Sequence, residues 1–327
     1  MSSRTIAVIG ATGHQGSGVV SALLSTTSFA VKAIARDPSS RKAQTLLDQH
    51  ATAAWKGRLE VVKGDLTEPS TLEEALEGVQ GVFASFGYLG RGGTEGEETE
   101  EAKQGKALVD VLEKLDVKHF VYSALPSIMK ASEGKYTHAS QFDSKAIVAE
   151  YAKKQLPAVT LLIPGVFYSN LSSPIYSQRQ DDLSARFCMP VKQTTSLQWV
   201  DDRYDIGQFA TAVFSAGPFN TAGKTYPVMS APLTMPDLAQ QYVAPTGEKA
   251  TFDPLPLDEA LGMTKRMTGN DMTLEFGDMF RFLDAVPPGT TAYGTLRPEE
   301  DTSFEDLGVK ASTLAEFLER TGFRVGQ

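Results

Sequence analysis

Short apolar runs alternate with longer segments of helical periodicity through the first 165 residues of the chain. The runs are rich in β-branched residues and predict strands at 5–9, 31–36, 59–63, 81–86, 119–123 and 159–163. The intervening segments predict helices at 16–25, 40–49, 71–76, 97–115 and 142–154. Strands that alternate with helices form parallel βαβ units, in which helices cover both faces of the sheet. The pattern therefore predicts an α/β fold with a doubly wound parallel sheet, the Rossmann architecture.

The alternation fades after residue 164, where long loops bearing Gly, Pro and Ser separate the apolar segments. Two segments in this half, 234–237 and 313–316, place an acid three residues after a threonine, which is the pattern of a capped helix start. We therefore expect a Rossmann domain over residues 1–165 and a smaller, mostly helical substrate lobe over residues 166–327. Some elements of the second lobe are expected to return to the sheet.

Composition places the chain among ordinary globular proteins. It has 327 residues, of which 41% are apolar and 22% charged, and its 31 Lys plus Arg and 40 Asp plus Glu leave a net charge of −9. These values exclude collagen, coiled coil and bulk disorder, and the lack of clustered basic residues argues against a nucleic-acid partner. Without a signal peptide or 18 consecutive apolar residues, we expect no membrane association and a soluble protein of the cytoplasm or the nucleus.

Metal chemistry is not expected. The chain has one cysteine, Cys188, in an apolar Phe-Cys-Met segment, so that neither an intrachain disulfide nor a cysteine-rich metal site is possible. Its four histidines share no metal-ligand spacing. We interpret Cys188 as a packing residue.

The sequence from Gly10 to Gly16 is a glycine loop, Gly-Ala-Thr-Gly-His-Gln-Gly, placed between the first predicted strand and the first predicted helix. Its spacing is G-x-x-G-x-x-G, which differs from the usual G-x-G-x-x-G dinucleotide fingerprint, but the physical roles are the same. Gly10 allows a tight turn, Gly13 lets the backbone approach a pyrophosphate, and Gly16 lets the helix pack on the strand. The alternative is a glycine-rich turn that binds nothing.

The second predicted strand ends at Arg36, where an NAD site usually offers a carboxylate to the ribose. A guanidinium pairs with a 2′-phosphate and stacks on adenine, and Arg41 follows on the next helix, which favours NADP(H) over NAD(H). The alternative is a solvated surface charge next to Asp37. Asp65 and Leu66, after the third strand, lie where adenine is expected, although Asp65 is equally suited to cap a helix over 67–77.

Further motifs occur in order along nearly the whole chain, and with the glycine loop they resemble those of the NmrA-like family of atypical short-chain dehydrogenase/reductases. The motifs are Ala35-Arg36-Asp37-Pro38, Gly64-Asp65-Leu66, Ala102-Lys103-Gln104-Gly105-Lys106, Val121-Tyr122-Ser123, Phe142-Asp143-Ser144-Lys145, Pro164-Gly165-Val166-Phe167 and Leu314-Ala315-Glu316-Phe317.

The resemblance implies a set of cofactor-binding residues. It assigns this role to the glycine loop and Arg36, and it adds the end of the fourth strand and three further positions. Together with the residues argued above, the expected cofactor site consists of Gly10, Thr12, Gly13, His14, Gln15, Gly16, Arg36, Arg41, Asp65, Leu66, Ser85, Phe86, Gly87, Lys103, Lys145, Val166, Phe167 and Tyr168.

The catalytic residues of an ordinary short-chain dehydrogenase are only partly present. Such an enzyme uses a tyrosine four residues before a lysine to protonate the carbonyl oxygen as hydride arrives. Here Gln141 stands four residues before Lys145, and an amide does not donate a proton to the reaction. Ser123, at the end of the fifth strand, is either the usual catalytic serine or a hydroxyl that satisfies a turn. We select Lys145 as the catalytic residue, the alternative being an exposed helical lysine.

Two functions follow from the resemblance, because the family contains both reductases and NADP-binding redox sensors. The first is an NADP(H)-dependent oxidoreductase that reduces a small hydrophobic or aromatic substrate by hydride transfer. The second is a non-catalytic NADP(H) sensor that regulates protein partners, and the glutamine at position 141 favours it. A third possibility is a fold recruited to bind an intermediate. The loop at 88–93 is expected to act as a lid over the cofactor.

Overall fold

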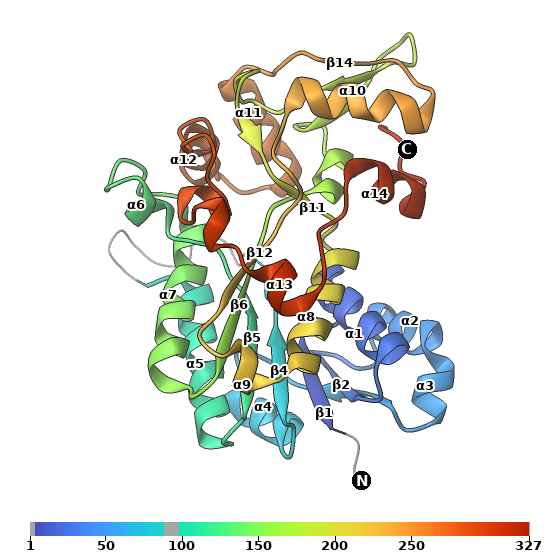
Figure 1. The fold of residues 1–327 in the computed structure, drawn as a ribbon, viewed down its shortest axis with the longest axis vertical. Helices are drawn as coiled ribbons and strands as arrows, with labels where there is room; N and C mark the ends of the chain where they lie inside the picture. The colour runs from blue at the N-terminus through green and yellow to red at the C-terminus, as the bar shows by residue number, and fades with distance from the viewer. Residues whose placement is uncertain (1–3, 88–97, 327) are drawn as a thin grey trace.

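A computed structural model describes residues 4–87 and 98–326 of the chain. Its central element is a seven-stranded sheet in the order β12-β6-β5-β4-β1-β2-β3, in which every neighbouring pair is parallel (Figure 1). The strands are β1 Thr5–Ile9, β2 Ala30–Ala35, β3 Leu59–Lys63, β4 Gly81–Ala84, β5 His119–Ser123, β6 Val159–Pro164 and β12 Thr225–Val228. The doubly wound α/β prediction is confirmed.

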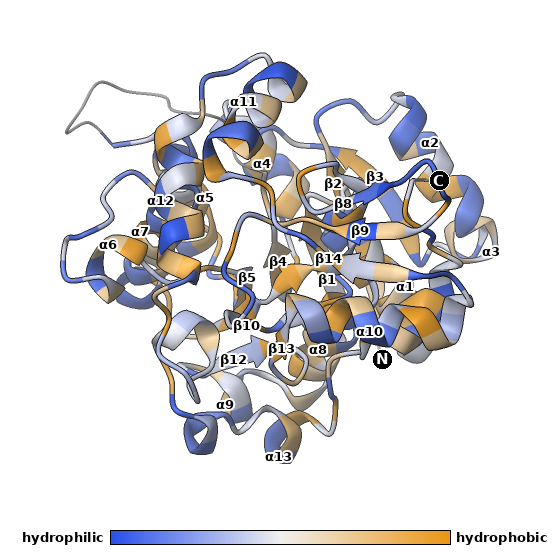
Figure 2. Ribbon diagram, turned by 90° about the horizontal axis from the view of Figure 1, so that it is seen from above, coloured by the Kyte–Doolittle hydropathy of each residue, from blue (hydrophilic) through white to orange (hydrophobic). Residues whose placement is uncertain are grey.

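Helices cover both faces of this sheet because its strands are apolar on both sides. Ile6 and Val8 of β1 pack with α1, α2 and α8, whereas Ala7 and Ile9 pack with α4, α5 and α7 on the opposite face. Apolar residues gather on the central strands and hydrophilic ones on the outer helical turns (Figure 2). The helices of this half of the molecule are α1 His14–Thr26, α2 Arg41–Gln49, α3 Ala51–Trp55, α4 Pro69–Leu76, α5 Glu100–Lys114, α6 Ile128–Ala131, α7 Ser140–Gln155, α8 Tyr204–Ala216 and α9 Pro218–Thr221.

The sequence patterns located the first six strands to within two residues, but they missed β12, α3 and α6. Strand β12 is short, lies at the edge of the sheet beside β6 and contains Pro227, which only an edge strand or a bulge tolerates. The helix predicted at 71–76 is α4, which begins two residues earlier at Pro69, and the alternative of a helix over 67–77 is not observed.

The second half of the chain builds an upper lobe of helices and three small sheets. Its core is aromatic, with Tyr168 stacked between Trp199 and Phe317 at ring-centroid distances of 5.6 and 5.2 Å. Both predicted capping boxes are present, at Thr234 and Thr313. The elements are β7 Val166–Phe167, η1 Tyr168–Ser172, β8 Ser177–Arg179, β9 Ala185–Phe187, β10 Ser196–Leu197, β11 Trp199–Val200, β13 Leu233–Thr234, α10 Met235–Thr246, β14 Ala250–Phe252, α11 Leu257–Thr268, α12 Thr273–Leu283, η2 Ala292–Gly294, η3 Pro298–Glu300, α13 Ser303–Leu307 and α14 Leu314–Thr321.

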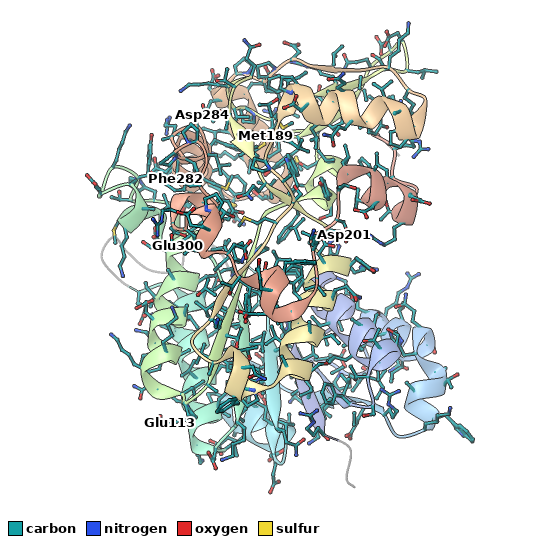
Figure 3. The ribbon with its side chains drawn as sticks, in the orientation of Figure 1. Glu113, Met189, Asp201, Phe282, Asp284 and Glu300 are labelled. Atoms are coloured by element: carbon teal, nitrogen blue, oxygen red, sulfur yellow. The ribbon has the colours of Figure 1, made fainter. Side chains whose placement is uncertain are left out.

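Buried carboxylates before and within the first turn of α8 tie the upper lobe to the sheet. Asp201 pairs with Arg320 of α14 and lies at the level where the two parts of the molecule meet (Figure 3). Asp205 accepts hydrogen bonds from the backbone N–H and hydroxyl of Ser312 at 3.0 and 2.6 Å. Burial raises the pKa of Asp205 to about 6. These bonds hold the C-terminal segment against the end of the sheet that carries the glycine loop.

Helices α1 and α8 approach closely at a pair of glycines. A Cβ at Gly18 would collide with the carbonyl oxygen of Arg203, and a Cβ at Gly207 would lie 2.5 Å from the carbonyl oxygen of Gly18. Because the obstructing atoms are backbone, neither helix accommodates a side chain there without moving. This contact sets the position of α1 and therefore of the glycine loop at its N-terminus.

The substitution Gly18→Ala is expected to lower the free energy of unfolding by about 1–3 kcal/mol, the usual cost of overpacking. Gly262→Ala, in α11, is the matched control. There the nearest atom to an added Cβ is Arg266 Nη1 at 3.5 Å, so the better helix propensity of alanine should stabilise by about 0.5–1 kcal/mol. Urea unfolding of the two variants measures both effects, and equal stability changes would contradict the packing argument.

Candidate functional site

The glycine loop forms a compact turn without room for side chains. Gly10 has a φ of +78°, and a Cβ on it would collide with the carbonyl oxygen of Ser85. The N–H of Gly13 donates to the carbonyl oxygen of Gly10 at 2.9 Å, and α1 begins at His14. A Cβ at Gly16 would collide with the Gly10 carbonyl. The first N–H groups of a helix have no partner within it, so the start of α1 fits a pyrophosphate.

His14 connects this loop to the start of α8. Its Nδ1 lies 2.9 Å from Oδ2 of Asp202, with the imidazole 63% exposed and the carboxylate 3% exposed. The hydrogen bond to Asp202 raises the pKa of His14, although burial and the neighbouring charges of Arg203 and Lys42 oppose it. Asp202 lies 188 residues away along the chain, and no motif in the sequence indicated this pairing. On either side of His14, Thr12 and Gln15 are half-buried.

Arg36 and Asp65 follow neighbouring strands at the same edge of the sheet. Arg36 is exposed directly after β2. Asp65 Oδ1 accepts from the N–H and hydroxyl of Thr67 at 2.9 and 2.8 Å. Mainly these bonds, together with the charge of Arg36, lower the pKa of Asp65. Asp65 therefore closes a turn ahead of α4 and is not the cap of a helix over 67–77.

Two other predicted residues of the adenine side lie next to this edge. Leu66 is half-buried and packs against the core beneath the sheet edge. Arg41 is the exposed first residue of α2. Its neighbour Lys42 acts electrostatically on His14, which places the start of α2 near the glycine loop.

Lys145 is a partly buried lysine rather than an exposed helical one. Its side chain is 15% exposed, and its Nζ pairs with the carboxylate of Glu101, which is 1% exposed. The ammonium also donates to the carbonyl oxygen of Phe86 at 3.1 Å and lies 5.6 Å from the centre of the Phe86 ring. Three contacts therefore hold the lysine at the carboxyl end of the sheet. Gly87, the next residue, is exposed with open space around its Cα.

Glu101 is a functional candidate that the sequence analysis missed. Acidic residues at the start of a helix usually serve the helix dipole, but Glu101 belongs to the buried face of α5 with Gly105, Leu108 and Leu112. That helical spacing was the available signal. Burial raises the pKa of Glu101, while Lys145 opposes the shift. Its second oxygen, Oε2, has no hydrogen-bond partner within residues 4–87 and 98–326.

A small cavity opens between the glycine loop and Lys145, with a volume of about 140 Å³. Ser123 donates from its hydroxyl to Oε1 of Gln15 at 2.6 Å, so the serine meets a side chain of the glycine loop instead of satisfying a turn. Most of the wall is apolar or aromatic. The described lining residues are Gln15, Ser123, Ala124, Leu125, Phe142, Lys145, Pro164, Gly165, Val166, Phe167, Asn170, Tyr176, Met279, Leu283 and Tyr293.

Several predicted residues lie elsewhere. The side chain of Tyr168 is fully buried in the aromatic core of the upper lobe, so it does not line the cavity as expected. Lys103 is half-exposed on α5 and pairs with Glu100 at 2.9 Å. The expected lid at 88–93 falls outside the described residues.

Four other sequence expectations concern inert or absent chemistry. Burial raises the pKa of the Cys188 thiol to about 12, which agrees with a packing residue. Both amide atoms of Gln141 are buried, and neither finds a hydrogen-bond partner among the described residues. In the same part of the chain, no cluster of three metal-ligating side chains occurs. Nor does any described helix have the length and apolarity to cross a membrane.

The parallel sheet and the glycine loop at the start of α1 define a doubly wound α/β protein of the Rossmann type. A family model described as the NmrA-like family matches residues 2–318. The chain therefore belongs to the NmrA-like family, and the resemblance noted from its motifs is confirmed.

Several curated relatives are described as NmrA-like family domain-containing oxidoreductases. The chain is 27% identical over 261 residues to the NmrA-like family domain-containing oxidoreductase malD of Malbranchea aurantiaca, a match that covers 76% of this chain and 75% of that protein. It is 27% identical over 273 residues to the oxidoreductase cpsB of Aspergillus campestris, covering 76% and 74%.

Solved structures share the fold at lower identity. NmrA, a negative transcriptional regulator in complex with NADP, matches with a TM-score of 0.70 and 16% identity over 99% of this chain and 93% of that one. The NADPH-dependent quinone oxidoreductase QOR2 of Escherichia coli, complexed with NADPH, matches with a TM-score of 0.69 and 21% identity over 97% and 100%. The triphenylmethane reductase of Citrobacter sp. gives 0.66 and 20% over 96% and 99%.

Removal of the lysine charge should make stability depend on pH. In Lys145→Met the buried Glu101 loses its counter-charge, so its folded pKa rises further above the unfolded value and the folded state binds the proton more tightly than in the wild type. We expect the variant to lose about 3 kcal/mol of unfolding free energy at pH 8 and to recover part of it as the pH falls toward 5.

The double variant Glu101→Gln/Lys145→Met is the control, since it has no buried carboxylate to protonate at this position. Denaturant unfolding at several pH values measures the difference from wild type. A difference for Lys145→Met that stays constant from pH 8 to pH 5 would show that Glu101 is not held charged by Lys145.

Proposed function

We propose that this protein is an NADP(H)-dependent oxidoreductase that reduces a small hydrophobic or aromatic substrate by hydride transfer. The observation that carries the proposal is the apolar cavity beside the glycine loop, into which Lys145, Ser123 and Gln15 project the polar groups. Ligands of open α/β sheets bind outside the carboxyl ends of the strands, and this cavity lies at the ends of β5 and β6. Its apolar walls suit an uncharged ring better than a sugar or a phosphate.

The choice of NADP(H) rests on charge and on the relatives. The start of α1 suits the pyrophosphate, and the exposed guanidinium of Arg36 suits a 2′-phosphate beside it. The two carboxylates near Arg36 already accept hydrogen bonds, Asp65 from Thr67 and Asp37 from Ser39. Structural neighbours were crystallised with NADP or NADPH, and NmrA also with NAD.

In the proposed reduction, each residue around the cavity has a separate role. Bound NADPH would supply a hydride from its nicotinamide ring. Lys145 donates a hydrogen bond to the oxygen or nitrogen of the acceptor and delivers the proton that balances the hydride. Glu101 and the Phe86 carbonyl keep the ammonium in place, and the apolar wall excludes water from the reacting atoms.

The other candidates for the proton donor fit this role less well. Gln141 occupies the position of the usual tyrosine and carries no acidic group. Tyr176 lines the cavity, but burial raises its pKa to about 12. Burial also raises the pKa of Tyr293, which lines the cavity from the other side.

The rival function is an NADP(H) sensor that regulates a protein partner without turnover. Two observations favour it: the glutamine at the tyrosine position and the engagement of Lys145 in a buried ion pair. One structural neighbour is described as a negative transcriptional regulator in complex with NADP. The oxidoreductase proposal is preferred because a sensor has no need of the apolar cavity against Lys145.

Turnover separates the two functions. NADPH oxidation, followed at 340 nm with quinones, enones and imines, should be substrate-dependent for the wild-type protein, and Lys145→Met should lower kcat by about 10²–10⁴-fold, the range of general acid catalysis. Lys154→Met, on the exposed side of the same helix, is the matched control and should leave the rate unchanged. Tight NADPH binding with no turnover of any acceptor would favour the sensor.

Arg36→Ala tests the cofactor preference. A lost charge-assisted hydrogen bond costs about 1.5–3 kcal/mol, so the Kd for NADP should rise by roughly ten- to a hundred-fold. The Kd for NAD, which lacks the 2′-phosphate, should change by less than about threefold. Isothermal titration with both cofactors makes the comparison within one variant, and equal losses for the two would remove the 2′-phosphate from the role of Arg36.

A further inference from the structure

Tyr293 stands where three cavities of the protein meet. The first is the cavity of about 140 Å³ that contains Lys145. The second is an outer groove of about 750 Å³ between α7, the edge of the sheet and residues 285–296, and the third is a cavity of about 330 Å³ against residues 192–198. Among the described residues, Tyr293 is the only one that lines all three.

The backbone conformation of residues 292–294 sets the direction of the Tyr293 side chain. Ala292, Tyr293 and Gly294 have φ values of +49°, +59° and +85°, three left-handed residues in succession of which two are not glycine. Non-glycine residues in this region cost of order 1 kcal/mol or more each and persist only where the surroundings over-determine them. Thr291 and Leu296 close the loop with two backbone hydrogen bonds at 2.9 and 3.3 Å. The strained turn points the tyrosine inward.

The ring is fixed at both ends. Its hydroxyl donates to the carbonyl oxygen of Pro164 at the end of β6, at 3.0 Å. Its face meets the ring of Phe142 at 90°, with centroids 5.2 Å apart, and Phe142 lies on α7 one turn before Lys145. The tyrosine therefore forms a rigid wall between the lysine and the outer groove.

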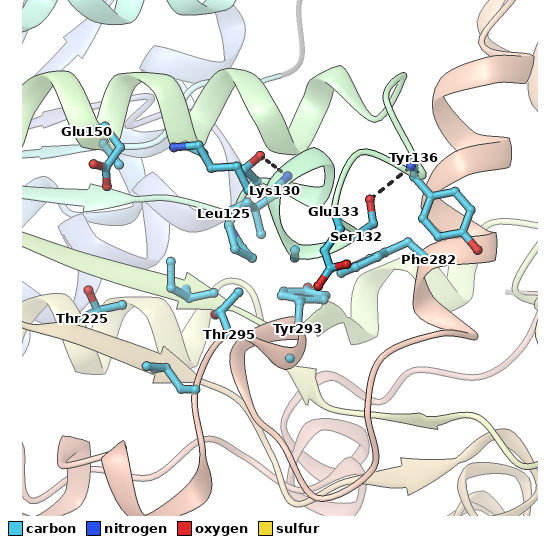
Figure 4. Close-up of a pocket in the computed structure, with 18 of the residues that line it drawn as sticks. Leu125, Lys130, Ser132, Glu133, Tyr136, Glu150, Thr225, Phe282, Tyr293 and Thr295 are labelled. Atoms are coloured by element: carbon cyan, nitrogen blue, oxygen red, sulfur yellow. Dashed lines mark hydrogen bonds between the residues drawn. The ribbon is translucent and has the colours of Figure 1, made fainter.

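The cavity beside Lys145 is smaller than most small-molecule sites. Small-molecule sites usually occupy about 300–1,000 Å³, more than the 140 Å³ beside Lys145. The outer groove, at about 750 Å³, is large enough to hold the rest of a larger ligand. The apolar part of its lining includes Leu125, Leu161, Ile163 and Phe282. Figure 4 shows Leu125, Phe282, Tyr293 and Thr295 around this groove. Leu125 and Tyr293 are the described residues that line both spaces.

We propose that Tyr293 determines substrate size by closing the Lys145 cavity against the outer groove. With the wall in place the cavity accepts a single small ring, and without it a ring bound beside Lys145 extends into the groove. The inference rests on the proposed function, because it takes the Lys145 cavity as the substrate site. It concerns binding, so it is testable without turnover.

The experiment is a ring-size series on the protein saturated with NADP⁺. Isothermal titration with phenol, 1-naphthol and 9-phenanthrol should rank phenol first for the wild-type protein. Tyr293→Ala should reverse this order, with 9-phenanthrol gaining at least tenfold in affinity. Tyr293→Phe keeps the ring and loses only the bond to the Pro164 carbonyl, so it should rank the ligands as the wild type does.

Two further variants keep the test decisive. Leu125→Ala thins the same wall from the other side and should shift the ranking in the same direction, which covers the case in which Tyr293→Ala does not fold. Phe276→Ala removes an aromatic ring of α12 that contacts Phe280 and lines none of the three cavities, and it should leave the ranking unchanged.

An unaltered ranking in both wall variants, or no binding of any ring to them, overturns the proposal. If no acceptor supports NADPH oxidation by the wild-type protein while the ligand ranking still shifts in the wall variants, the proposed function fails and the role of Tyr293 in ligand size is supported. If turnover occurs and the ligand ranking does not shift, the proposed function is supported and the role of Tyr293 in ligand size fails.

Discussion

The site depends on how closely backbone approaches backbone around α1. Three glycines each lie against a backbone carbonyl that leaves no room for a Cβ. Gly10 lies against the carbonyl of Ser85, and Gly16 against that of Gly10. Gly18 lies against the carbonyl of Arg203. These contacts bring the first helical N–H groups to the ends of β1 and β4. Because backbone atoms have no rotamers to adjust, side chains larger than hydrogen would push the phosphate-binding turn away from the sheet.

A second constraint is electrostatic. The pairing of Lys145 with Glu101 places an ion pair under a wall of apolar side chains, where each charge needs the other. An amine that is anchored by a carboxylate and a carbonyl has one fixed direction from which to meet an acceptor. In the proposed mechanism this pairing stands in for the tyrosine of ordinary short-chain dehydrogenases. The proposed acid is a cation held in place, not a phenol activated by one.

The C-terminal part of the chain completes the site from above. Asp201 and Asp205, ahead of and within α8, bind Arg320 and Ser312, while Asp202 binds the histidine of the glycine loop. The strained turn at Tyr293 then covers the lysine. Segments nearly 300 residues apart thus share one small cavity, which Gln15 of the glycine loop and Tyr293 of the C-terminal half both line.

The sequence by itself determined the sheet, the glycine loop and the family, because these depend on local periodicity and on contiguous motifs such as 10–16. Only the tertiary structure decided the partners of the site residues. Glu101, Asp202 and Tyr293 come from segments with no chemical motif, and Tyr168 has the right motif but a side chain drawn into an aromatic core. Packing between distant segments selects which side chains face the cavity, and that selection is absent from any local pattern.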